Sequence, residues 1–296
     1  MNKIILIIIL NLGNIYRFYN RFFKTVARFD KLIRFRILKK GPYKVQDFLM
    51  FIEPEAPMYN ELVIGNGYHE KCTTNLINNY LKDGMTFIDV GANIGYFTLV
   101  AARKVEKNGR VFSFEPELEN FDLLSKNVEL NRLNNITFEN IALSNLEGEI
   151  VLNKDPNSKG RHSICISREG WVPIRCKAMR LDAYFKKTQI HIKQIDFIKI
   201  DAEGAELAIL KGMENLIDPK KTLILLEFSK KLIIESGSTV KDFVDYLSEI
   251  GYDRATVINE KLQEKYVVDM SKLLSLEDGT YNLLLSNTKN LSSNKE

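Results

Sequence analysis

The chain has 296 residues, of which 45% are hydrophobic and 27% charged, so it can bury a core without disulfides or structural metals. Its three cysteines, Cys72, Cys165 and Cys176, form no Cys-x-x-Cys pair, which argues against a zinc module and favours a reducing, cytoplasmic setting. The net charge of +4 is unevenly distributed along the chain, because residues 1–40 carry ten Lys/Arg and one Asp. The rest of the chain is therefore acidic, which argues against nucleic acid as a partner.

Residues 1–40 predict a basic amphipathic helix. The apolar run from Ile4 to Leu10 is much shorter than the roughly 20 residues that span a bilayer, and no signal-peptide cleavage site follows it. From Ile15 to Ile33, apolar residues recur at intervals of three and four with Lys and Arg between them. Such a helix suits peripheral contact with an anionic membrane, or packing on the domain or a partner; the Ile-rich start favours the membrane.

The remaining chain divides into three predicted parts. Residues 41–83 predict a small cap of short strands and one helix over 70–81. Residues 84–286 alternate short apolar runs with helical patterns, which predicts a doubly wound α/β sheet, and residues 287–296 predict a disordered tail. Within the second part, 144–177 breaks the rhythm and predicts a substrate insertion. The expected strands are 85–90, 110–114, 136–139, 195–200, 222–228, 255–258 and 281–285, and the expected helices are 96–105, 117–133, 203–216 and 240–250.

The most informative segment is T-F-I-D-V-G-A-N-I-G-Y-F-T at 86–98, between a predicted strand and a predicted helix. Gly91 allows a tight turn close to a ligand, and Gly95 allows the helix to start near it. The spacing G-x-N-x-G does not match the dinucleotide fingerprint G-x-G-x-x-G. Asp89 would repel a pyrophosphate but can accept hydrogen bonds from a ligand ammonium group.

Two further strand ends predict a nucleoside site. Glu115, in F-E-P, follows Gly91 by 24 residues and can accept hydrogen bonds from both hydroxyls of a ribose. Asn140 and Ile141 follow the third strand, where an adenine edge would arrive. S-adenosylmethionine combines an amino acid, a ribose and an adenine, so it is the ligand that these three elements favour.

These motifs resemble those of the FkbM-type S-adenosylmethionine-dependent methyltransferases. The resemblance spans about residues 60–286 and is carried by F-I-D-V-G-A-N-I-G at 87–95, F-E-P at 114–116, N-x-x-x-N at 127–131 and I-K-I-D-A-E-G-A-E at 198–206. It implies a Rossmann-like class I methyltransferase fold, with a mostly parallel seven-stranded sheet whose last strand is antiparallel. It also implies that the cofactor is bound by Asp89, Gly91, Asn93, Gly95 and Glu115, with Asn140 and Ile141 near the adenine.

The segment 198–206 carries the candidate chemistry. It is expected to place Asp201 at a strand tip, Glu203 and Glu206 on one helix face, and Lys199 away from the site. Transfer of a methyl group to a hydroxyl requires that the acceptor lose its proton to a base, with or without a divalent cation. Asp201 is the leading candidate base and Glu203 the second. Helix capping and metal ligation are the alternatives for Asp201.

Three residues outside that segment are further candidates. His162 lies in the 144–177 insertion and is the better placed of two histidine base candidates, the other being His69. A lone histidine is more often a surface or hydrogen-bonded residue, so each also has a structural interpretation. Glu227, at the tip of the fifth strand, is a candidate for substrate contact.

The sequence therefore predicts an S-adenosylmethionine-dependent O-methyltransferase that acts on a hydroxyl of a sugar, glycan, lipid-linked saccharide or natural product, with no metal expected. One alternative is a non-catalytic, membrane-recruited binding module on the same fold; the intact acidic set of 201, 203 and 206 argues against it. Another is a nucleic-acid methyltransferase; the acidic body and the missing Asn/Asp-Pro-Pro-aromatic motif argue against that.

Overall fold

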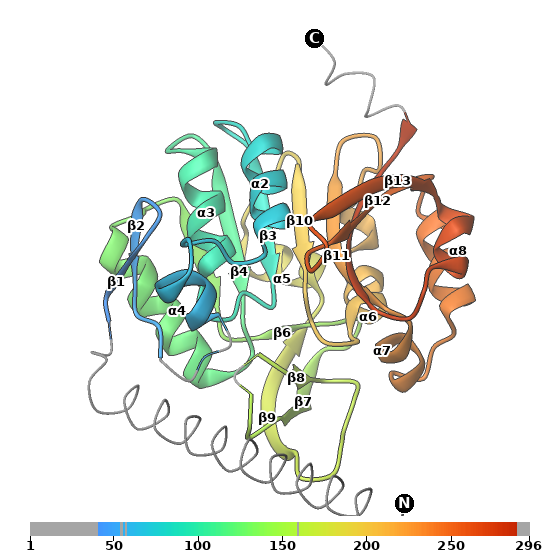
Figure 1. The fold of residues 1–296 in the computed structure, drawn as a ribbon, viewed down its shortest axis with the longest axis horizontal. Helices are drawn as coiled ribbons and strands as arrows, with labels where there is room; N and C mark the ends of the chain where they lie inside the picture. Colours follow the sequence, from blue (N-terminus) through green and yellow to red (C-terminus); the bar gives the residue numbers. More distant parts are fainter. Residues whose placement is uncertain (1–40, 54–55, 57, 159, 289–296) are drawn as a thin grey trace, which may run out of the picture.

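The computed structural model describes residues 41–53, 56, 58–158 and 160–288, which form a large sheet with helices on both faces (Figure 1). The predicted helix over 1–40, with its membrane contact, and residues 289–296 of the predicted tail lie outside this range and stay predictions. None of the described helices is long and apolar enough to cross a membrane.

The large sheet has eight strands in the order β13–β12–β14–β11–β10–β3–β4–β5. The strands from β11 to β5 run parallel, whereas β14 runs antiparallel to both β11 and β12. Seven strands thus confirm the predicted mostly parallel sheet with an antiparallel last strand, and β13 adds an unpredicted strand at the edge. The bounds are β3 (Thr86–Val90), β4 (Arg110–Phe114), β5 (Ile136–Glu139), β10 (Phe197–Ile200), β11 (Leu223–Ser229), β12 (Arg254–Asn259), β13 (Glu264–Asp269) and β14 (Thr280–Ser286).

Two apolar cores lie on the two faces of this sheet, because successive side chains of a strand point to opposite faces. On β3, Phe87 joins the core under three helices, whereas Ile88 joins the core under four others. The first face is covered by α2 (Lys71–Tyr80), α3 (Tyr96–Val105) and α4 (Leu118–Asn131). The second is covered by α5 (Leu181–Thr188), α6 (Glu206–Lys211), α7 (Lys230–Glu235) and α8 (Val240–Glu249), of which α5 and α7 were not predicted.

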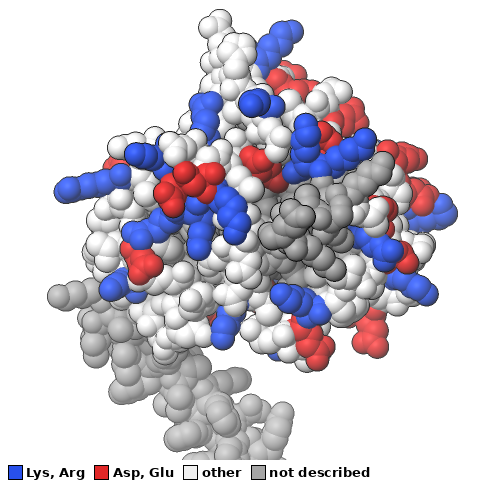
Figure 2. All heavy atoms as spheres, turned by 90° about the horizontal axis from the view of Figure 1, so that it is seen from above, with Lys and Arg blue, Asp and Glu red and all other residues white. Residues whose placement is uncertain are grey.

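The predicted insertion supplies most of a second, four-stranded sheet with the order β6–β9–β7–β8. This sheet lies beneath the large one in Figure 1, at the end where the parallel strands finish. Its strands are β6 (Ala142–Leu143), β7 (Gly148–Lys154), β8 (His162–Ser163) and β9 (Val172–Met179). On the opposite side of the molecule, Lys and Arg side chains are interspersed with Asp and Glu (Figure 2).

The N-terminal cap is held by the N-x-x-x-N pair of α4. The hairpin of β1 (Tyr43–Val45) and β2 (Phe48–Met50) packs along this helix, followed by a π-helix at Asn60–Ile64. Asn127 is fully buried; its Oδ1 accepts the Phe51 N–H (2.6 Å), and its Nδ2 donates to the carbonyls of Phe51 (3.3 Å) and Ile94 (2.8 Å). Asn131, one turn later, accepts the Leu49 N–H (2.9 Å) and donates to the Leu49 carbonyl (2.7 Å). Both amides therefore pair with the backbone as a neighbouring strand would.

We predict that Asn127→Ala lowers the free energy of unfolding by roughly 1–3 kcal/mol, because it removes the hydrogen bonds of a fully buried side chain and leaves backbone groups of Phe51 and Ile94 without partners. Asn131→Ala is the matched control; its site is partly exposed and water can replace the amide, so the loss should stay below about 1 kcal/mol. Denaturant unfolding of the two variants measures the difference, and equal losses would contradict this account of the cap.

Candidate functional site

A cavity of about 550 Å³ opens at the carboxyl ends of the parallel strands, between the large sheet and the insertion. Its walls come from the loops after β3, β4, β5 and β10, from Glu227 within β11, from the insertion between Asn157 and Ile164, and from the segment just before α2. The order β11–β10–β3–β4 places the cavity where the chain changes direction across the sheet, which is where ligands bind in open α/β sheets. Its volume lies in the range of about 300–1,000 Å³ that is typical of small-molecule sites.

The loop after β3 approaches the loop after β10 with no room for a side chain. Gly91 has a φ of +75°, and a Cβ there would lie 1.9 Å from the Asp201 carbonyl oxygen. The Asp201 N–H donates to the Val90 carbonyl (3.0 Å), so the two loops are also hydrogen bonded. Gly95, at a φ of +90°, begins α3, but its close neighbour is Leu124 of α4 rather than the cavity.

Glu115 lies at the tip of β4 with its carboxylate held by two backbone donors. Its Oε2 accepts the Asn93 N–H (2.8 Å) and its Oε1 accepts the Glu117 N–H (2.9 Å). The side chain lines the cavity and is 5% exposed. Burial raises the pKa of this carboxyl to about 7, against the opposing effect of the two N–H donors. An ionised carboxylate has about four acceptor positions, so further hydrogen bonds from a ligand are possible.

The other predicted cofactor residues fall into two groups. Ile141, like Gly91, Asn93 and Glu115, lines the cavity. Asp89, Gly95 and Asn140 lie behind its wall: Asn140 Nδ2 donates to the carbonyls of Glu115 (2.9 Å) and Pro116 (3.1 Å). The Asp89 carboxylate is fully buried and accepts a hydrogen bond from Thr98 Oγ1 (2.6 Å), while its Oδ1 has no hydrogen-bond partner among the described residues.

The segment after β10 differs from the prediction. Helix α6 begins at Glu206 rather than Glu203, because Glu203 and Gly204 have positive φ values (+50° and +96°) and form a turn. The Glu206 carboxylate folds back to accept the N–H groups of Ala202 (3.1 Å) and Gly204 (3.3 Å). The prediction that Glu203 and Glu206 share a helix face is therefore wrong, and only Glu203 lines the cavity.

The same geometry removes one interpretation of Asp201. The N-cap position of α6 belongs to Ala205, so Asp201 does not cap the helix. Asp201 lines the cavity instead, together with Glu203 and His162. Burial, and then the charge of Asp201, raise the pKa of Glu203 to about 7. His162 has both ring nitrogens buried without partners among the described residues, and burial lowers its pKa.

Lys199 is a further correction, because it lies in the site and not away from it. Its Nζ donates to Asp201 Oδ2 (3.0 Å) and lies 4.7 Å from the centre of the Phe97 ring. Burial lowers the pKa of Lys199, but the charges of Asp201, Asp89 and Glu70 outweigh it, so the net pKa is raised. Lys199 points to the face of β10 opposite to Ile198 and Ile200, and this face also borders the cavity.

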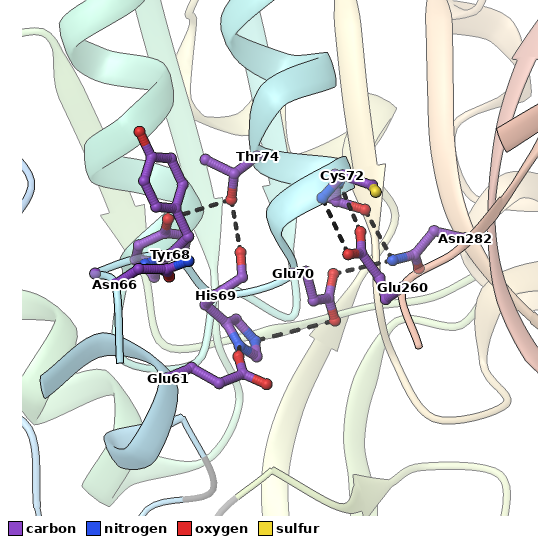
Figure 3. A network of polar contacts seen from close by, with 12 residues as sticks. Glu61, Asn66, Tyr68, His69, Glu70, Cys72, Thr74, Glu260 and Asn282 are labelled. Atoms are coloured by element: carbon purple, nitrogen blue, oxygen red, sulfur yellow. Dashed lines mark hydrogen bonds and ion pairs between the residues drawn. The ribbon is translucent and has the colours of Figure 1, made fainter. Parts of the chain in front are cut away.

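The segment just before α2 brings His69 and Glu70 into the cavity wall (Figure 3). His69 Nδ1 lies 2.5 Å from Glu61 Oε2, and its Nε2 lies 4.0 Å from Glu70 Oε1. Burial lowers the pKa of His69, but the hydrogen bond to Glu61 and the charges of Glu70 and Glu61 reverse this, so its pKa is raised.

Glu70 occupies the N-cap position of α2 without capping it. Its φ of +44° is left-handed, a conformation that costs a non-glycine residue roughly 1–2 kcal/mol. The capping role passes to Glu260, whose carboxylate accepts the N–H groups of Cys72 (3.0 Å) and Thr73 (2.6 Å). Sequence reasoning did not find Glu70; a helix that starts without Ser, Thr, Asp or Asn at its cap was the available signal.

The last cavity carboxylate is Glu227, which the sequence named as a candidate for substrate contact. It stands on β11 directly opposite Asn282 of β14, and it lines the cavity. Its Oε2 is buried and has no hydrogen-bond partner among the described residues. Burial and the nearby charge of Asp201 raise its pKa well above the usual value. Within the described ranges, no group of three or more His, Cys, Asp or Glu side chains is arranged to hold a metal ion.

Comparisons with known proteins identify the family of the chain. The family model described as the methyltransferase FkbM domain matches residues 89–254, more than half of the chain. "Methyltransferase 1" of Beauveria bassiana is 22% identical over 187 residues, which cover 57% of this chain and 73% of that protein. The hexuronic acid methyltransferase AglP of Haloferax volcanii is 30% identical over 162 residues, which cover 54% of this chain and only 60% of that protein.

One solved structure that resembles the chain is a methyltransferase FkbM from Methylobacillus flagellatus. It is 20% identical, with a TM-score of 0.42, and the match covers 63% of this chain and 44% of that one.

We predict that Gly91→Ala lowers the free energy of unfolding by at least about 3 kcal/mol, because a Cβ adds a clash with the Asp201 carbonyl to the strain of a positive φ. Gly170→Ala is the matched control: its φ is +81°, and a Cβ there would meet nothing within 4 Å, so only the strain of roughly 1–2 kcal/mol applies. Thermal and denaturant unfolding compare the two variants. A Gly91 variant as stable as the control would show that the loops can separate freely.

Proposed function

The chain belongs to the FkbM family of S-adenosylmethionine-dependent methyltransferases, and from this premise we propose that it methylates a hydroxyl of a sugar, glycan, lipid-linked saccharide or natural product. The observation that carries this proposal is one cavity in which Glu115, fixed by two N–H donors, and Asp201, fixed by Lys199, flank the side-chain-free turn at Gly91. A relative named as a hexuronic acid methyltransferase supports a sugar-like acceptor.

The residues present fit the cofactor. Glu115 would accept hydrogen bonds from the two ribose hydroxyls, Ile141 would pack against the adenine, and the turn at Gly91 and Asn93 would lie against the cofactor. Asp89, Gly95 and Asn140 would not contact the cofactor. They would support the cavity wall, Asp89 and Gly95 by shaping the loop after β3 and Asn140 by holding the turn that carries Glu115. The cofactor supplies an electrophilic methyl group on a sulfonium.

Asp201 is the proposed base. One of its oxygens is committed to Lys199, while the side chain is 35% exposed and lines the cavity, so the carboxylate has a fixed orientation and a free acceptor. It would take the proton of the acceptor hydroxyl as that oxygen accepts the methyl group that the bound cofactor would supply. Glu203 and His162 would contact the acceptor on either side.

The alternatives have less support. A non-catalytic module has no use for a buried lysine that orients a carboxylate toward the cavity. A nucleic-acid acceptor would meet a wall rich in carboxylates, since Glu70, Glu203 and Glu227 line the cavity beside Asp201.

We predict that Glu115→Gln weakens S-adenosylmethionine binding by at least tenfold, about 1.4 kcal/mol, because the charge-assisted bonds to the ribose are lost. Since the pKa of Glu115 is raised to about 7 and the ligand needs the ionised form, wild-type affinity should increase as the pH rises through 7, and the variant should lack this component. Calorimetric titration from pH 6 to 8, with NAD as a ligand that should not bind, measures both effects. Unchanged affinity in the variant would place the ribose elsewhere.

We predict that Asp201→Asn lowers the turnover number by roughly 10²–10⁴-fold while affinity for S-adenosylmethionine changes by less than about threefold, because the amide cannot take the proton. Transfer of labelled methyl groups to a hydroxylated acceptor gives the rate, and calorimetry gives the affinity. Asp245→Asn, on the surface of α8, is the control and should keep full activity. Near-normal turnover of the Asp201 variant would assign the base to another residue.

A further inference from the structure

Among the described residues, the cavity is lined by more carboxyl groups than Lys and Arg side chains. Among the described residues that line it, six carry carboxylates: Glu53, Glu70, Glu115, Asp201, Glu203 and Glu227. Two of the described lining residues carry a Lys or Arg side chain, namely Lys199 and Arg161. Both are already paired, Lys199 with Asp201 Oδ2 (3.0 Å) and Arg161 with Asp155 Oδ2 (3.1 Å). Neither forms an ion pair with Glu70 or Glu227, although the charge of Lys199 acts on Glu70.

Glu227 shows that this imbalance points to a ligand. The side chain lines the cavity, and its Oε2 is buried and accepts no hydrogen bond from any described residue. A buried carboxylate oxygen without a donor is unfavourable in a folded protein unless a ligand or an ordered water supplies one. The strongest donor for it is a charged N–H group.

Glu70 is held next to the same place by independent means. Asn282, which pairs with Glu227 across β14 and β11, donates from Nδ2 to Glu70 Oε2 (2.9 Å), as Figure 3 shows. Because Glu260 caps α2 instead, the left-handed backbone of Glu70 turns its side chain toward the cavity. The other carboxyl oxygen of Glu70 lies 4.0 Å from His69 Nε2.

The order of the strands places this pair on the acceptor side. Neighbouring strands lie about 4.8 Å apart, so β11 is about 10 Å from β3 and further still from Glu115 on β4. The proposed nucleoside site extends over β3, β4 and β5. Glu227 therefore lies beyond Asp201, on the side where the hydroxyl acceptor must enter.

We propose that the acceptor carries an ammonium group, as an amino sugar does, and that Glu227 and Glu70 bind it beside the hydroxyl that is methylated. This inference rests on the proposed function and names the acceptor class of that same site. It also implies that a carboxylate-bearing sugar is disfavoured, because its charge would meet Glu70, Glu203 and Glu227.

The test uses three sugars that share one ring but differ in charge: glucosamine, glucose and glucuronic acid. Their dissociation constants are measured by NMR titration with the full-length protein saturated with S-adenosylhomocysteine, so that no turnover occurs. We expect glucosamine to bind at least tenfold more tightly than glucose, and glucuronic acid to bind most weakly. Equal binding of glucosamine and glucose, tighter binding of glucuronic acid, or no binding of glucosamine at tens of millimolar would overturn the proposal.

Variants separate this subsite from the cofactor site. Glu227→Gln should remove the preference for glucosamine over glucose, while Glu227→Asp, which keeps the charge, should retain it. Glu53→Gln removes the same charge from another wall and should change the preference by less than about threefold.

Affinity for S-adenosylhomocysteine should stay within about threefold in all three variants. If Glu227→Gln lost as much affinity for S-adenosylhomocysteine as for glucosamine, Glu227 would be assigned to the cofactor's own ammonium group. That outcome would overturn the proposal. Failure of the proposed function would appear separately, as absence of S-adenosylmethionine binding by the wild-type protein.

Discussion

The contact between the ends of β3 and β10 is the constraint on which the site depends. Gly91 rests on the Asp201 carbonyl with no space for a Cβ, and the Asp201 N–H is bonded to Val90. The turn proposed to admit the cofactor and the strand tip proposed to carry the base are therefore one rigid unit. Lys199 extends this unit by fixing the Asp201 carboxylate, so the direction of the proposed base is set before any ligand arrives.

Concentrated carboxylates around this unit reduce the stability of the fold. Burial raises the pKa of Glu115, Glu203 and Glu206 to about 7 from an ordinary value of 4.5. Each of these groups holds its proton more tightly in the folded protein than in the unfolded chain. The free energy of unfolding therefore falls as the pH rises from about 4.5 through 7. A cationic ligand in the cavity would favour the ionised form of the carboxyls that line it, which links the charge of the cavity to what it can bind.

Much of the fold was readable from the sequence, because strands and helices carry their own periodicities. The helix at 96–105 and the strands at 110–114 and 136–139 have the predicted bounds. The edge strand β13 and helices α5 and α7 were not predicted; each is short, with six to eight residues. The start of α6 was placed too early because Glu203 favours the first turn of a helix, whereas the structure uses it in a left-handed turn.

The sequence by itself determined the family, the cofactor class and the three strand-end motifs, because Gly91, Glu115 and Asp201 each lie in a local segment that has its own pattern. Only the tertiary structure decided which side chains meet in the cavity. Lys199 joins Asp201 because both point to the face under α2 and α3, and Glu70 is free to face the cavity because Glu260, 190 positions later in the chain, caps α2 in its place. Such pairings depend on how distant segments pack, and no periodicity within a single segment encodes them.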